Sequence, residues 1–69
     1  MKKLIAVIEE DGEISTEEIR HKRPQTYMLT DWTFDRLLNY IKDELWANPE
    51  NVKAIELDYG DGTCRTLSR

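Results

Sequence analysis

The feature that most constrains the fold is an amphipathic segment, 31–46, which lies between two Asp-Gly turns. Apolar residues recur along it at i, i+3, i+4, i+7 and i+11, namely Phe34, Leu37, Leu38, Ile41 and Leu45. At about 100° per residue in an α-helix, these side chains form one apolar stripe. The spacing therefore predicts a helix over about 31–46 whose stripe must be buried against another element.

A first hairpin is predicted before this helix. Residues 3–9 are rich in Ile, Val and Leu, and an Asp-Gly pair at 11–12 connects them to a returning segment over 13–20. Asp-Gly tolerates the positive φ angles of a tight hairpin turn. Ile14 and Ile19 are an odd number of residues apart, so one faces inward and the other outward unless a bulge intervenes.

A second hairpin is predicted after the helix. Residues 52–59 alternate in polarity, with Lys53 falling on the same face as the apolar positions, which is typical of a half-buried strand. The glycine-rich turn 60–62 connects them to a return over 63–67. A further short strand is expected over 25–29, before the helix.

Together these segments predict one small α+β domain over 1–69. We expect a mainly antiparallel sheet of about three to five strands, with the helix packed on one face. The expected core combines Leu4 or Ile5 with Val7 or Ile8, according to register. The other expected core residues are Tyr27, Leu29, Phe34, Leu37, Leu38, Ile41, Leu45, Ile55, Leu57 and Tyr59.

A different order of elements is the main alternative. In it, 2–10 is a first helix, 12–14 a short strand, 15–20 a second helix opened by a Ser-Thr-Glu-Glu capping box, and 31–46 a third helix. With 52–68 as a two-stranded wing, this order is similar to a winged helix-turn-helix. The resemblance implies a DNA-binding regulator whose third helix enters the major groove.

Two observations weigh against the winged-helix interpretation. The connection over 21–30 is long for a motif that normally uses a turn of about three or four residues. Residues 2–8 are also β-branched and strand-like. The sheet with one helix is therefore the preferred fold.

Charge and size favour a protein partner. Fourteen acidic and ten basic residues give a net charge of −4, which argues against nucleic acid because phosphate binding needs clustered Lys and Arg. A chain of this length buries only about 60% of its unfolded surface, so a partner surface, either a homodimer or a bound target, is expected to add stability.

Localisation is inferred from the apolar runs. The run over 4–8 is too short for a signal-peptide core, and no run approaches the roughly 18 residues of a membrane span. We expect a cytoplasmic protein that does not enter a membrane, with Cys64 reduced.

Residues that carry chemistry are sparse. The single cysteine, Cys64, excludes an internal disulfide, and the single histidine, His21, leaves it without a nearby base in sequence. The acidic runs lack the alternating spacing of calcium loops, and none of the three glycines opens a helix to cradle phosphate. We expect no catalytic, metal or cofactor site, and hence no enzyme.

The candidate partner site lies on one flank of the predicted helix. Exposed tryptophans are favoured anchors of protein interfaces. On a helical wheel, the two tryptophans point away from the apolar stripe. The candidate residues are Trp32, Asn39, Asp43 and Trp46. The alternative is that both tryptophans cover the ends of the core. The expected function is a non-catalytic protein-binding module, an inhibitor or adaptor, which acts through this flank or an exposed sheet edge.

A second candidate is the one basic cluster in the sequence, a possible contact for an anion. It consists of Arg20, His21, Lys22 and Arg23. The alternative is a solvated loop whose charges discourage aggregation of an edge strand.

Overall fold

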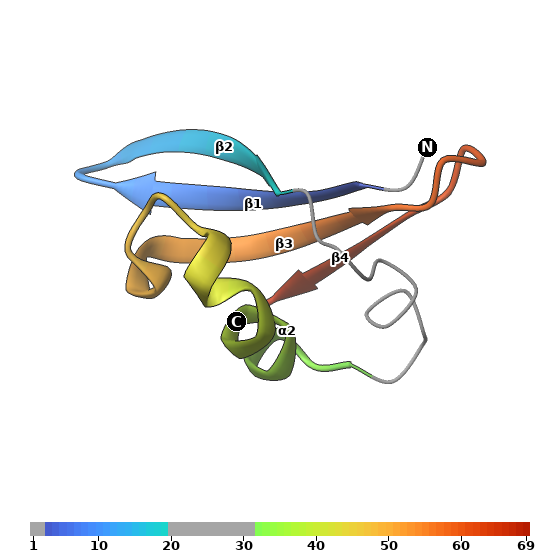
Figure 1. Ribbon diagram of the computed structural model, residues 1–69. Coiled ribbons are helices and arrows are strands. Elements are labelled where there is room, and N and C mark those ends of the chain that lie inside the picture. Colours follow the sequence, from blue (N-terminus) through green and yellow to red (C-terminus); the bar gives the residue numbers. More distant parts are fainter. Residues whose placement is uncertain (1–2, 20–31) are drawn as a thin grey trace.

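The part of the chain that the structure describes folds into a four-stranded antiparallel sheet with one α-helix on one face (Figure 1). The computed structural model describes residues 3–19 and 32–69. The elements are β1 (Lys3–Glu10), β2 (Glu13–Ile19), α2 (Phe34–Ile41), the 3-10 turns η1 (Lys42–Glu44) and η2 (Pro49–Asn51), β3 (Val52–Asp58) and β4 (Cys64–Ser68). The strand order is β2-β1-β3-β4. The predicted α+β class is confirmed, whereas the strand expected over 25–29, with Tyr27 and Leu29, lies outside the described residues.

The first hairpin excludes the winged-helix order of elements. Lys3–Glu10 and Glu13–Ile19 are both strands, paired along their length, where that alternative requires two helices. Glu10 pairs with Glu13, so only two residues connect the strands. Both have positive φ, 53° at Asp11 and 80° at Gly12, as in the turn that best matches the twist of a hairpin.

The register of β2 places its two isoleucines on opposite faces. Ile19 lies opposite Leu4 and is buried, whereas Ile14 lies opposite Glu9 and is 62% exposed. The pairing between these positions is continuous, without a bulge. The odd spacing therefore has the consequence predicted from sequence.

A bulge in β3 changes which residue enters the core. Val7 pairs with Ala54 and Ile8 pairs with Val52, so Lys53 is an extra residue without a partner on β1. The shift turns Val52 inward, where it is fully buried, and leaves Lys53 exposed. The expectation that Lys53 shares the apolar face is wrong, because simple alternation does not anticipate an inserted residue.

The helix is shorter than predicted. It begins after Thr33, whose Oγ1 accepts a hydrogen bond from the Arg36 N–H at 3.3 Å, and the chain changes to a 3-10 turn after Ile41. Asp43 and Glu44 lie in that turn, after Lys42, and negative charge is unfavourable at a helix C-terminus. The helix predicted over 31–46 is therefore corrected to Phe34–Ile41.

The core lies between α2 and the inner face of the sheet, defined as the face that α2 covers. Register selects Leu4 and Ile8 from the sequence alternatives and leaves Ile5 and Val7 half-buried. Leu38, Leu45 and Tyr59 pack against the core but stay partly exposed. The buried side chains are Leu4, Ala6, Ile8, Ile19, Trp32, Phe34, Leu37, Ile41, Val52, Ile55 and Leu57.

Candidate interaction site

Trp32 belongs to the core. Its side chain is only 9% exposed, and its ring meets the Tyr40 ring edge-on, with centroids 5.0 Å apart. The Arg36 guanidinium carbon lies 4.3 Å from the Trp32 ring centroid, in a cation–π arrangement. Trp32 therefore covers the core, as the alternative interpretation of the two tryptophans predicts, and it does not stand exposed on the helix flank as the candidate partner site requires. Trp32 precedes the helix, and its indole packs against residues of the first two turns.

Trp46 has the opposite environment, because 96% of its surface is exposed. It does not lie on the helix but follows η1, one residue after the half-buried Leu45, whose backbone is extended (φ −82°, ψ 136°). The chain is thus anchored at Leu45 and presents the next side chain to solvent.

The backbone around Trp46 is held by the carboxylate of Glu17. Glu17 Oε2 accepts the Trp46 N–H at 2.9 Å, and Glu17 Oε1 accepts the Ala47 N–H at 3.4 Å. Glu17 pairs with Ala6 in the sheet, so its side chain is on the inner face, toward α2 and the segment that follows it. A single carboxylate therefore fastens this segment to β2, in charge-assisted hydrogen bonds.

The remaining residues of the predicted flank are exposed, but they do not share one helix face with the two tryptophans. Asn39 is on α2 and Asp43 is in η1. Because the α-helix ends at Ile41, the helical wheel no longer relates Asp43 or Trp46 to the positions before it. The structure brings Trp46 together with Glu17 instead, a residue that sequence reasoning missed because 29 residues separate the two.

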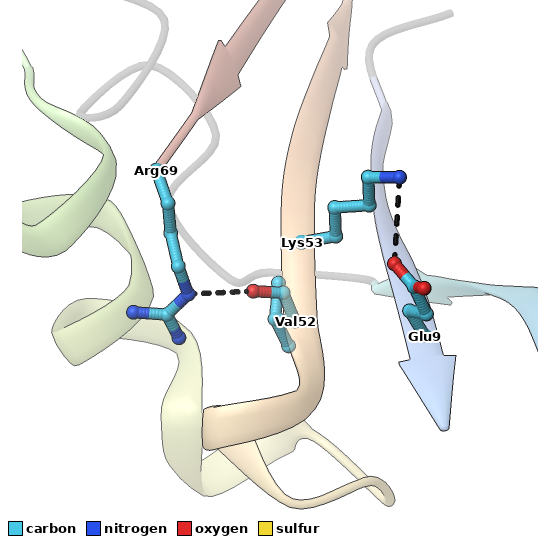
Figure 2. Close-up of polar contacts among 4 residues, drawn as sticks. All are labelled: Glu9, Val52, Lys53 and Arg69. Atoms are coloured by element: carbon cyan, nitrogen blue, oxygen red, sulfur yellow. Dashed lines mark hydrogen bonds and ion pairs between the residues drawn. The ribbon is translucent and has the colours of Figure 1, made fainter. Parts of the chain in front are cut away.

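A second polar arrangement fastens the end of the chain (Figure 2). Arg69 Nε donates to the Val52 carbonyl at 3.0 Å, and Arg69 Nη2 donates to the Pro49 carbonyl at 3.0 Å. The guanidinium carbon also lies 4.9 Å from the Phe34 ring centroid. Nothing in the sequence pattern singled out Arg69, since its partners are backbone atoms and a ring far from it in sequence.

An open groove lies beside this arrangement, with a volume of about 420 Å³. Lys53 and Glu9 both line this groove. Lys53 Nζ lies 3.4 Å from Glu9 Oε2 (Figure 2). Both side chains are about half exposed, so the ion pair is solvated and weak. The lining residues are Glu9, Asp11, Gly12, Glu50, Asn51, Val52, Lys53 and Arg69.

In the turn between β3 and β4, aspartate side chains accept hydrogen bonds from backbone N–H groups of the same turn. Asp58 Oδ1 accepts the Gly60 N–H at 2.9 Å, and Asp61 Oδ1 accepts both the N–H and the hydroxyl of Thr63. The hydrogen bonds from Thr63 lower the pKa of Asp61 below its ordinary value of 3.8. These carboxylates act as local hydrogen-bond acceptors in an exposed turn.

The basic cluster over 20–23 lies outside the described residues. Cys64 is an exposed free thiol at the start of β4. Among residues 3–19 and 32–69, no three His, Cys, Asp or Glu side chains gather closely enough to hold a metal ion, and none of the helices there has the length and apolar character needed to cross a membrane.

No known protein family, curated protein or solved structure matches this chain.

Proposed function

We propose that this chain is a small, non-catalytic protein-binding module, of the inhibitor or adaptor kind, whose contact surface is centred on Trp46. The observation that carries the proposal is a tryptophan 96% exposed on a backbone that Glu17 holds with two hydrogen bonds. The sheet and helix serve as the scaffold that presents it.

The energetics of association support Trp46 as an anchor. An indole offers a large apolar area with few rotatable bonds, and tryptophan is enriched among the residues that contribute most to binding. A backbone that is already fixed loses less conformational entropy when a partner docks. Leaving such a side chain in water has no benefit for the folded domain itself, because burial of an aromatic ring stabilises it.

The chemistry around Trp46 indicates the kind of partner. Asp43 and Glu44 are exposed just before it in sequence, and the whole chain carries a net charge of −4. Opposite charges around an interface raise the rate of association and select the partner. The complementary surface is therefore an apolar pocket with a basic rim.

The proposal is tested by affinity capture from the native host, followed by measurement with the purified partner. We expect Trp46→Ala to weaken the complex by more than about tenfold, as for an anchor residue, and Trp46→Phe to retain part of the affinity. Glu50→Ala, an exposed change in η2, is the control and should bind like the wild type. A complex that forms equally well with Trp46→Ala would overturn the proposal.

A further inference from the structure

The face of the sheet opposite α2, here called the outer face, is apolar at its centre. Ile5 and Val7 of β1 and Ala54 of β3 are half-buried there, and the 62% exposed Ile14 of β2 lies at one end. The register puts Val7 beside Ala54 and leaves these side chains out of the core cluster. Among the described elements, the one α-helix packs on the other side, as Figure 1 shows. Sheets that bury only one face keep this apolar content low unless something covers it.

Acidic side chains flank the apolar centre of the outer face. Ile5 lies directly between Glu18 of β2 and Glu56 of β3, which are its cross-strand neighbours on either side. The two lysines of this region already have acidic neighbours, since Lys53 pairs with Glu9 and Lys3 lies opposite Asp58. Glu18 and Glu56 therefore supply the excess negative charge of the face.

We infer that the outer face is a second binding surface, whose partner is a basic amphipathic protein segment. Such a segment would place its apolar side chains on Ile5 and Val7 and its Lys or Arg side chains on Glu18 and Glu56. Both contributions match what the face presents: apolar area to bury, and two carboxylates that have no ion-pair partner among residues 3–19 and 32–69.

A second copy of this chain is the less suitable occupant. Two-fold packing of the outer face on itself would bring Glu18 and Glu56 of one copy toward the same carboxylates of the other. Like charges placed together in an interface oppose association. The charge pattern thus favours a partner of opposite sign over a homodimer.

This surface is independent of Trp46. Glu17, which holds the backbone of Trp46, points to the inner side, whereas the adjacent Glu18 points to the outer side. An experiment that excludes binding at one of these two surfaces therefore does not exclude binding at the other.

The test is a titration of the ¹⁵N-labelled protein with a synthetic amphipathic helix of leucine and lysine, in about 0.15 M salt so that distant charges are screened. We expect the largest changes in NMR chemical shift at the backbone amides of Ile5, Val7 and Ala54. The same helix with glutamate in place of lysine should not bind.

Two matched double variants make the test specific. Glu18→Lys with Glu56→Lys should weaken binding about tenfold. Glu10→Lys with Glu13→Lys, on the inner side of the β1–β2 hairpin, should change it less than about twofold. If the first pair does not fold, Glu18→Gln with Glu56→Gln gives the same comparison at smaller amplitude. The inference is overturned if both pairs of substitutions weaken binding equally, or if the chemical-shift changes map to the α2 side. It is also overturned if the chemical shifts of the outer-face amides change with protein concentration alone, as in self-association.

Discussion

Glu17 and Trp46 lie 29 residues apart in the sequence, yet the Glu17 carboxylate accepts the backbone N–H of Trp46 at 2.9 Å. The same carboxylate accepts the N–H of Ala47, so one side chain of the edge strand β2 binds two backbone N–H groups of the segment after the helix. The bonds act on the backbone only and leave the indole of Trp46 in water.

The first prediction concerns this hydrogen-bonded contact. Glu17→Ala should lower the free energy of unfolding by about 1 kcal/mol, because two backbone donors lose a charged acceptor at a partly solvated site. Glu18→Ala is the matched control, since the adjacent side chain points to the outer face, and we expect a change within about 0.5 kcal/mol. Urea denaturation followed by circular dichroism measures both. Equal losses in the two variants would show that the Glu17 contact contributes nothing specific.

The second prediction tests the register of β2 with two identical residues. Ile19→Val should destabilise the domain by about 1 kcal/mol, because Ile19 is only 3% exposed and lies opposite Leu4. Ile14→Val, at a position 62% exposed, should stay within about 0.5 kcal/mol of the wild type. Thermal unfolding of both variants gives the comparison. A larger loss at Ile14 would mean that the strand is shifted by one residue.

The third prediction concerns the pH dependence of the turn between β3 and β4. Thr63 donates to Asp61 in the folded state and lowers the pKa of that carboxyl, so its contribution to stability is present above about pH 3.8 and is lost as the pH falls through the folded-state value. Asp61→Asn should therefore show a shallower loss of stability on acidification than the wild type. A carbon NMR titration of Asp61 checks the cause directly, and a midpoint at or above 3.8 would contradict it.

The fourth prediction concerns Arg69, whose guanidinium donates to the carbonyls of Val52 and Pro49. Arg69→Lys should destabilise the domain almost as much as Arg69→Ala, about 1 kcal/mol, because a single ammonium cannot reproduce a planar fork that also covers Phe34. Chemical denaturation of the two variants decides this. Full recovery of stability by lysine would mean that charge alone matters at this position.

The parts of the fold that the sequence predicts are those with local causes. β1 follows from its β-branched residues, the hairpin from Asp11 and Gly12, and the buried stripe from the spacing of Phe34, Leu37 and Ile41. Each signal lies within a few residues of the structure it produces, so periodicity and turn chemistry were sufficient.

The corrections have causes that are not local. The bulge that leaves Lys53 exposed exists only in the pairing of β3 with β1, and the helix end at Ile41 moves Trp46 off the helical wheel. The burial of Trp32 depends on Tyr40 and Arg36, which pack on its indole. Two tryptophans that looked equivalent in the sequence therefore have opposite environments.

The proposed function depends on an indole that is free in solvent on a backbone that is not, and amide hydrogen exchange at Trp46 measures both at once. We expect the indole N–H of Trp46 to exchange at the rate of an unprotected group. Its backbone N–H should exchange more slowly than an unprotected amide in the wild type. In Glu17→Ala, exchange of that backbone N–H should become faster than in the wild type. A protected indole N–H, or a backbone N–H of Trp46 that exchanges without protection in the wild type, would contradict the proposed anchor.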